Sequence, residues 1–246
     1  MINKFRFVFK KYSFKKGILF ILKYPFRFIK HFFYKYLIFK NDNIEYKFTN
    51  IYKNNYWGSS ESKSGEGSNL DFTINIRSEL PKLCKNYGIK VLFDAPCGDF
   101  NWMKHIINYM GINYIGADIV KEMVEMNKKN YNNNKINFLH LDITKDILPK
   151  ADLMLCRDCL FHFSYYDIKS FLLNFLNSDI PYLLTTTYND NCSNKDIFTG
   201  DFRRIDLFSS PFNFPKDTLT SIDESREGRS LHLWTKDQIK SIPFIN

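Results

Sequence analysis

The chain has 246 residues, of which 44% are hydrophobic and 17% aromatic, enough for one sizeable domain with an appendage, and this composition excludes a largely disordered protein. Its net charge of +9 is concentrated at one end, because residues 1–40 hold 11 of the 35 Lys and Arg and none of the 26 Asp and Glu. The remainder has 24 basic against 26 acidic residues, which argues against a basic nucleic-acid-binding face, so no nucleic-acid partner is predicted.

Residues 1–40 mix large apolar side chains with basic ones. Their longest uncharged interior run, residues 17–22, is far shorter than the ~20 apolar residues that cross a bilayer. Basic residues spaced by seven, four and three fall on one helical face, and they are Lys16, Lys23, Arg27 and Lys30. Two interpretations stay open: a helix lying on an anionic membrane surface, or a helix packed on the rest of the protein or on a partner.

Residues 41–69 are polar and rich in Gly and Ser, which predicts a loop. A helix is expected next, capped by Ser68 or Asn69 and ended by Gly88. The predicted organisation is an N-terminal helical segment at 1–40, a loop at 41–69 and a single domain at 70–246.

Beyond that helix, short apolar runs alternate with stretches long enough for a helix or a crossover, which predicts an α/β domain with a mostly parallel sheet. The predicted strands are 90–94, 114–118, 137–141, 153–157 and 182–188. A last run at 230–235 is predicted to form an antiparallel strand at the sheet edge.

Three of the predicted strands lead into an aspartate. Asp94 ends the first and is followed by a tight turn with Gly98, Asp118 ends the second, and Asp142 follows the third. Because parallel strands end at one edge of a sheet, these carboxylates are expected to share a crevice that can bind two hydroxyls and an amine. The alternative for any one of them is an ordinary helix cap or strand end.

Other nucleotide-binding patterns are missing from the sequence. It contains neither the G-x-G-x-x-G fingerprint of dinucleotide sites nor a G-x-x-x-x-G-K phosphate loop. An acidic rim also repels phosphate, so the predicted ligand is a nucleoside without phosphate groups.

Four sequence strings, DAPCGDF, GADIV, LDIT and DLMLCRDCLFHF, resemble the first four motifs of class I S-adenosylmethionine-dependent methyltransferases, over about residues 70–188. The resemblance implies a Rossmann-like, seven-stranded, mostly parallel sheet with helices on both faces, and S-adenosylmethionine as cofactor. Pro96 replaces the first glycine of the commonest loop and Phe100 the last, as in a "DxPCG" variant of the family.

The resemblance also implies roles for individual residues. It places the methionine end of the cofactor on the loop 94–99, the ribose on Asp118, and the adenine on Asp142 and Ile143, with Ile119 flanking the base. The candidate cofactor contacts are Asp94, Ala95, Pro96, Cys97, Gly98, Asp99, Trp102, Asp118, Ile119, Asp142, Ile143 and Arg157. Arg157 is a candidate for the cofactor carboxylate, with a surface ion pair as its alternative.

Asp158 and His162 are the candidate catalytic residues. Four apart, they share a face if a helix begins there, and either could remove a proton from a hydroxyl group. The alternative is that Asp158 is a helix cap or a cofactor contact and that His162 is a packed histidine. No metal site is predicted, because the pair Cys156 and Cys159 has no second C-x-x-C and is interpreted as core packing.

Two stretches are predicted to shape the acceptor site. The loop with Trp57, Ser62, Ser64, Gly65 and Gly67 is expected to cover the cofactor as a lid. Beyond the fifth strand, Asp201, Arg203 and Arg204 could bind a phosphate or carboxylate of the acceptor, or form a solvated turn.

Four strings together are similar to a bacterial methyltransferase subgroup associated with surface-polysaccharide genes: DAPCGDFNWM, GADIV, ITKDILPKADLMLCRDCLFHFS and LLTTTY. This similarity implies O-methylation of a sugar or glycan precursor. N-methylation of another small molecule and a non-catalytic binding subunit are the alternatives. Five cysteines, an odd number, and no ordinary secretory signal predict a cytoplasmic location, with peripheral contact to the inner membrane through residues 1–40 if that segment binds lipid.

Overall fold

The computed structural model describes residues 41, 43–189, 193–224 and 228–245. The chain divides into two units, Met1–Asp42 and Asn43–Asn246, and the second contains nearly all of the described residues. The predictions for residues 1–40 lie outside the described residues. In the described part of the chain, no helix is long and apolar enough to cross a membrane.

A seven-stranded sheet organises the second unit, in the order β3-β2-β1-β4-β5-β7-β6. The strands are β1 (Val91–Asp94), β2 (Asn113–Asp118), β3 (Ile136–His140), β4 (Leu153–Cys156), β5 (Tyr182–Tyr188), β6 (Thr220–Asp223) and β7 (Arg229–Thr235). Neighbouring strands from β3 to β5 pair in parallel, whereas β7 runs antiparallel to both β5 and β6. The predicted fold class is confirmed, although β6, which buries only Ile222, had not been predicted.

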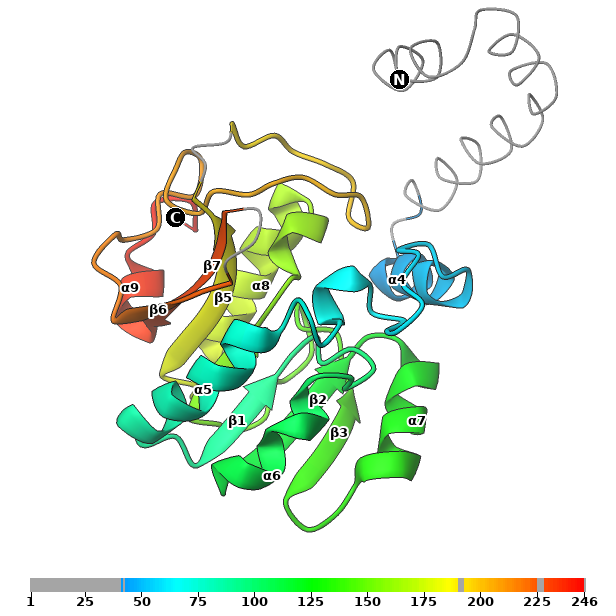
Figure 1. Cartoon of the computed structure of the whole chain (residues 1–246). Helices are drawn as coiled ribbons and strands as arrows, with labels where there is room; N and C mark the ends of the chain where they lie inside the picture. Colours follow the sequence, from blue (N-terminus) through cyan, green and yellow to red (C-terminus); the bar gives the residue numbers. More distant parts are fainter. Residues whose placement is uncertain (1–40, 42, 190–192, 225–227, 246) are drawn as a thin grey trace, which may run out of the picture. The chain divides into compact units, whose positions relative to one another are not determined.

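The strand order creates a crevice above β1. From β1 the chain moves outward to β2 and β3 (Figure 1), and it then returns to β4 on the other side of β1. Such a switch point leaves a gap between the crossover connections at the carboxyl ends of β1 and β4, and open α/β sheets bind ligands there.

Helices cover both faces of the sheet, as predicted. They are α4 (Ile44–Lys53), α5 (Ile74–Asn86), α6 (Ile107–Met110), α7 (Lys121–Tyr131), α8 (Tyr165–Asn177) and α9 (Lys236–Lys240), with 3₁₀ turns η1 (Glu66–Ser68), η2 (Met103–His105) and η3 (Leu160–His162). Successive strand residues face opposite sides, so Phe93 packs in one core with Phe171 of α8, whereas Leu92 packs in the other with Leu80 of α5.

Two predictions about the segment before the sheet were wrong. Residues 44–53 form helix α4 rather than loop, because Phe48 and Tyr52 lie one turn apart and pack against Ile119 and Met123, while Asn43 caps the first turn. Helix α5 begins at Ile74 and not at Asn69, which instead accepts turn hydrogen bonds through its carbonyl.

Candidate functional site

A cavity of about 320 Å³ lies at the carboxyl ends of β1, β2 and β4, and Asp94, Asp118 and Asp142 all line it. Most predicted site residues meet there. The predicted residues that line the cavity are Asp94, Pro96, Cys97, Gly98, Trp102, Asp118, Ile119, Asp142, Ile143, Arg157, Asp158 and His162. Ala95 and Asp99 do not line it, since Ala95 is fully buried and the Asp99 carboxylate turns to another loop.

Asp118 lies at the end of β2 with both carboxylate oxygens held. Oδ2 accepts a hydrogen bond from the Gly98 backbone N–H at 3.1 Å, and Oδ1 accepts one from Val120 N–H at 2.9 Å. Burial nevertheless raises the pKa of this carboxyl to about 6. Each oxygen keeps a lone pair, so the group can still accept hydrogen bonds from a ligand.

Asp94, at the end of β1, is buried more tightly. Its Oδ2 accepts a hydrogen bond of 2.7 Å from the Tyr114 hydroxyl, and burial raises its pKa to about 7. Both carboxyls are costly to ionise in this apolar setting. A bound cation would offset that cost by attraction and so favour their ionised forms.

Asp142 lies two residues after the end of β3, and its carboxylate bonds to residues of the turn that follows. Oδ1 accepts from the backbone N–H and the hydroxyl of Thr144, and Oδ2 lies 3.2 Å from Lys145 Nζ. The carboxylate therefore shapes the loop that carries Ile143 into the cavity, besides lining it.

Asp99 fastens the Gly/Ser loop instead of facing the cavity. Its carboxylate accepts hydrogen bonds from Ser62 Oγ at 2.9 Å, Lys63 N–H at 2.8 Å and Ser64 Oγ at 3.2 Å, and its own N–H donates to Ser64 Oγ. From the sequence, Asp99 is recognisable as an acid at the end of the predicted cofactor loop. Its hydrogen-bond partners are not recognisable, because they lie 35 to 37 positions earlier. The loop thus lies against the predicted cofactor loop.

Two glycines allow this close approach. At Gly98, which has φ +58°, a Cβ would lie 2.3 Å from Ser64 Oγ, so the missing side chain makes room for the serine. At Gly67 a Cβ would lie 2.6 Å from Asp158 Oδ2. The predicted lid residues Trp57, Ser64, Gly65 and Gly67 line the cavity, whereas Ser62 is buried against Asp99.

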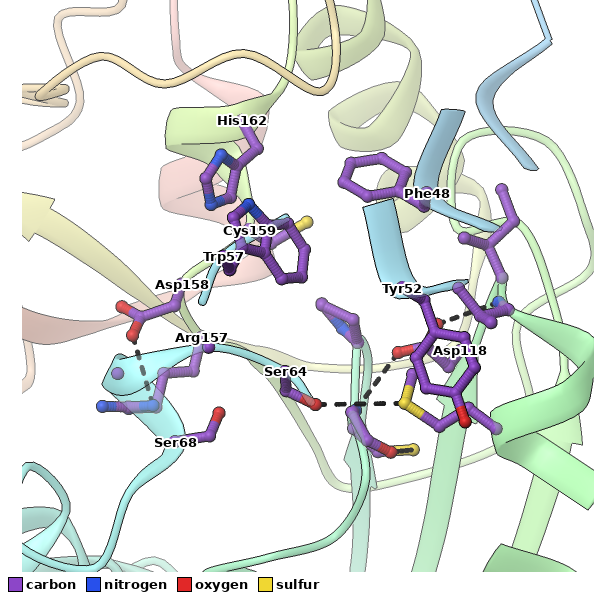
Figure 2. Close-up of a pocket in the computed structure, with 18 of the residues that line it drawn as sticks. Phe48, Tyr52, Trp57, Ser64, Ser68, Asp118, Arg157, Asp158, Cys159 and His162 are labelled. Atoms are coloured by element: carbon purple, nitrogen blue, oxygen red, sulfur yellow. Dashed lines mark hydrogen bonds and ion pairs between the residues drawn. The ribbon is translucent and has the colours of Figure 1, made fainter. Parts of the chain in front are cut away.

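Four charged side chains form a buried network beneath this loop. Arg157 Nε donates to Glu224 Oε1 at 2.8 Å, and Arg157 Nη1 lies 3.3 Å from Asp158 Oδ2 (Figure 2). Arg229 Nη1 donates to the same Asp158 oxygen at 3.0 Å. Two cations thus match two anions, and the surface-pair alternative for Arg157 is wrong because its side chain is 4% exposed.

Asp158 does not begin a helix, so the condition under which Asp158 and His162 would share a helix face is not met. The Asp158 φ of +51° is a left-handed conformation, which kinks the backbone between β4 and η3. Its N–H donates to Thr186 Oγ1 at 3.0 Å and its carboxylate is held by two guanidinium groups. Asp158 and His162 both line the cavity, but through this kink and not through a shared helix face.

His162 has the hydrogen-bonding pattern of a proton acceptor. Nδ1 lies 2.7 Å from the backbone carbonyl oxygen of Asp201, and a carbonyl only accepts, so Nδ1 carries the proton. The neutral ring then keeps a lone pair on Nε2, which bonds to no group within 43–189, 193–224 and 228–245. Burial lowers the pKa of His162, which favours this neutral form near pH 7.

The cavity has two chemically different sides (Figure 2). Asp118 and Tyr52 lie on one side, and His162, Trp57 and Asp158 on the other, with Ser64 between them. Trp57 stacks on His162, with ring centroids 5.2 Å apart and an interplanar angle of 27°. The first side thus combines the carboxylate of Asp118 with the ring of Tyr52, whereas the second combines the stacked rings of Trp57 and His162 with the carboxylate of Asp158.

The basic pair expected at the acceptor site is used elsewhere. Neither Arg203 nor Arg204 lines the cavity: Arg203 is buried and donates to the carbonyl oxygens of Phe163 and Leu160, and Arg204 lies over the Tyr188 ring. Asp201 contributes its carbonyl to His162.

Sequence reasoning missed Phe48, Tyr52, Glu224 and Arg229. The first two carried a signal, an apolar stripe along residues 44–52. The last two carried none, because Arg229 approaches Asp158 only through the antiparallel pairing of β7 with β5. Cys156 and Cys159 are buried core residues, as interpreted.

Residues 93–177 match the family model described as a methyltransferase domain. No curated protein sequence matches the chain. A SAM-dependent methyltransferase from Leishmania major is 13% identical, with a TM-score of 0.58 over 79% of this chain and 87% of that one. The 1,6-didemethyltoxoflavin-N1-methyltransferase of Burkholderia thailandensis, solved with bound S-adenosylhomocysteine, is 12% identical, with a TM-score of 0.51 over 78% of this chain and 86% of that one.

Human N-acetylserotonin methyltransferase is 15% identical over 64% of this chain, with a TM-score of 0.48. The chain spans 54% of that protein, about half its length. Residues 93–177 therefore match a methyltransferase-domain model, and the chain shares the fold of S-adenosylmethionine-dependent methyltransferases, whose cofactor a domain of this kind implies.

Proposed function

We propose that this protein transfers the methyl group of S-adenosylmethionine to a hydroxyl group of a small, uncharged ring compound, with His162 as the general base. We further propose that the acceptor is a sugar of a bacterial surface glycan or of its precursor. The observation that carries the first proposal is the His162 imidazole, whose proton is held on Nδ1 by the Asp201 carbonyl beside the cavity.

The residues present fit the cofactor. Asp118 can still accept a hydrogen bond from a ribose hydroxyl, although backbone N–H groups of Gly98, Ile119 and Val120 already bond to its carboxylate. Ile119 and Ile143 offer apolar contacts for a flat base on the same side. Two buried carboxyls with raised pKa values, Asp94 and Asp118, suit a ligand with a net positive charge.

Further residues would hold the remainder of the cofactor. Asp118 would hold the ribose, Asp142 and Ile143 the adenine, and the loop from Asp94 to Gly98 the methionine end. Arg157 Nη2 forms a buried ion pair with Glu224 Oε1 at 2.6 Å, and the guanidinium as a whole lines the cavity. That guanidinium would bind the cofactor carboxylate beside Ser68, which also lines the cavity.

When bound, S-adenosylmethionine supplies a methyl group on a positively charged sulfur, which a nucleophile displaces in line. The task of His162 is to accept the proton of the acceptor hydroxyl on Nε2 as the new oxygen–methyl bond forms. Asp158, already paired with Arg157 and Arg229, would bind a neighbouring hydroxyl of the acceptor and keep it in line.

The uncharged acceptor follows from the charges around the cavity. Arg157 and Arg229 are matched by Glu224 and Asp158, and Arg203 and Arg204 do not line the cavity. The aromatic side formed by Trp57, Phe161 and Phe202 suits the apolar face of a ring. The assignment to a surface glycan is supported by the similarity of the sequence strings to the polysaccharide-associated subgroup.

The test is methyl transfer from isotopically labelled S-adenosylmethionine to a panel of methyl hexosides, nucleotide-activated hexoses, phenols and amines, read by mass spectrometry. One labelled methyl group on a sugar oxygen is expected. Transfer only to amines would replace the proposal by N-methylation. Cofactor binding without transfer to surface glycan extracted from the source cells would favour a non-catalytic binding subunit.

A further inference from the structure

Trp57 and His162 form the centre of an aromatic cluster. Besides the stack with Trp57, the imidazole contacts Phe161 edge-on at 4.6 Å and Phe202 at 5.9 Å between ring centroids. Together with the hydrogen bond from Nδ1 to Asp201, these contacts restrict the ring to one orientation. Of the three aromatic neighbours, only Trp57 comes from the segment before the sheet.

Trp57 is itself held from two sides. Phe48 of α4 packs against its ring at 6.3 Å, and Gly65 lies so close that a Cβ there would be 3.3 Å from Trp57 Cβ. Gly65 follows Ser62, Lys63 and Ser64, which are bonded to Asp99. A continuous set of contacts therefore runs from Asp99, beside the cofactor loop, through the Gly/Ser loop to Trp57 and His162.

From this arrangement we infer that Trp57 is a positioning residue for the general base. It holds the imidazole of His162 in its proton-accepting orientation only while the Gly/Ser loop is fastened to Asp99 over the cofactor loop. The inference rests on the proposed function for its role in methyl transfer, but the Trp57–His162 coupling can be measured without any acceptor.

The pKa of His162 depends on charged groups around the ring and on its burial. Asp158 and Asp201 favour the protonated imidazole and Arg203 opposes it, while burial lowers the pKa of the ring most. Trp57 covers one face of the ring, so removing its indole admits water to that face. The pKa of His162 should then rise towards the ordinary value of about 6.5.

The test is nuclear magnetic resonance of the full chain with ¹⁵N- and ¹³C-labelled histidine, followed from pH 5 to 8 with S-adenosylhomocysteine bound. Comparison with His162→Gln assigns the signal among the five histidines. In the native chain we expect a single Nδ1–H tautomer that titrates below 6.5. In Trp57→Leu we expect both tautomers and a midpoint at least about 0.3 of a pH unit higher. Trp57→Phe, which keeps a ring to stack, should restore the native behaviour.

Asp99→Asn provides a second variant, in which neither Trp57 nor His162 is substituted. It replaces an acceptor of several hydrogen bonds by an amide that cannot accept all of them, so it should loosen the loop and move the His162 signal in the same direction. A His162 tautomer and midpoint unchanged in both folded variants would overturn the inference. If the inference holds but no acceptor is methylated, the proposed function alone fails.

Discussion

At the residue scale, the buried acids Asp94 and Asp118 of the cavity are the most informative groups, because they are costly to ionise. Burial raises the pKa of Asp94 to about 7 and that of Asp118 to about 6, against usual values near 4. Both are therefore partly protonated in the free protein at pH values where an ordinary aspartate is fully charged. A cationic ligand must bind the charged forms.

The affinity for S-adenosylmethionine should accordingly depend on pH. Since the ligand favours ionised carboxyls, affinity should rise by at least about tenfold between pH 5 and 7.5 as Asp118 and then Asp94 lose their protons. Calorimetry across this range, with circular dichroism to verify folding at each pH, checks it. A constant affinity would mean that neither carboxyl titrates against the ligand.

His162 is the residue on which proton removal depends in the proposed reaction. His162→Gln keeps a planar polar side chain but accepts no proton, so kcat should fall by about 10² to 10⁴. Cofactor affinity should stay within about twofold, because His162 lies on the side of the cavity away from Asp118 (Figure 2). Equal turnover in both proteins would assign the proton to another group or to water.

At the scale of elements, the Gly/Ser loop is fitted closely against the end of β4. In Gly67→Ala the new Cβ would lie 2.6 Å from Asp158 Oδ2, so the carboxylate or the loop must move. We expect faster hydrogen exchange at residues 62–68 and weaker cofactor binding. Gly58→Ala is the control: it strains a backbone with φ +72° in the same segment, but meets no atom within 4 Å. Similar exchange in the two variants would show that crowding against Asp158 is unimportant.

Helix α8 stabilises the sheet from one face. Phe171 is fully buried against the core that contains Phe93 and Trp234, so Phe171→Ala should lower the free energy of unfolding by about 3 to 5 kcal/mol. Tyr166 lies on the same helix but is 78% exposed, so Tyr166→Ala should change it by less than about 0.5 kcal/mol. Denaturant unfolding measures both, and equal effects would contradict the assigned packing.

The accuracy of the sequence predictions for individual elements followed from the kind of signal each carries. The buried parallel strands are apolar runs between turns, and β5 was predicted at its observed bounds, 182–188. Strand β6 has one buried residue and no run, and α4 lies in a polar stretch whose apolar stripe is short. The kink at Asp158 depends on a single left-handed residue, which no periodicity reveals.

At the scale of the whole molecule, the candidate site is assembled from segments far apart in the chain. The three aspartates could be predicted because each follows a strand, and topology alone brings strand ends together. The network of Glu224 and Arg229 with Arg157 and Asp158 could not, since it depends on β7 returning antiparallel to β5. Hydrogen-bond partners such as those of Asp99 are likewise a result of tertiary packing.

The arrangement of the fold thus places in one cavity an acidic side, to which we assign the nucleoside, and the side that holds Trp57 and His162. The first side comes from β1 and β2, which end in Asp94 and Asp118, and from the loop after β3 that carries Asp142, and the second from the β4 end and the Gly/Ser loop. A methyl donor on one side and an acceptor on the other would meet near Asp158 and His162.

The most direct measurement is calorimetric titration of the full chain with S-adenosylmethionine, compared with the same titration of Asp118→Ala. One site per chain is expected, and the variant should bind more weakly by about 1 to 3 kcal/mol, the loss of charged hydrogen bonds to the ribose. Asp217→Ala, an exposed acid outside the cavity, should bind as the native chain does. No binding by the native chain, or equal binding by Asp118→Ala, would contradict a nucleoside site at the ends of these strands.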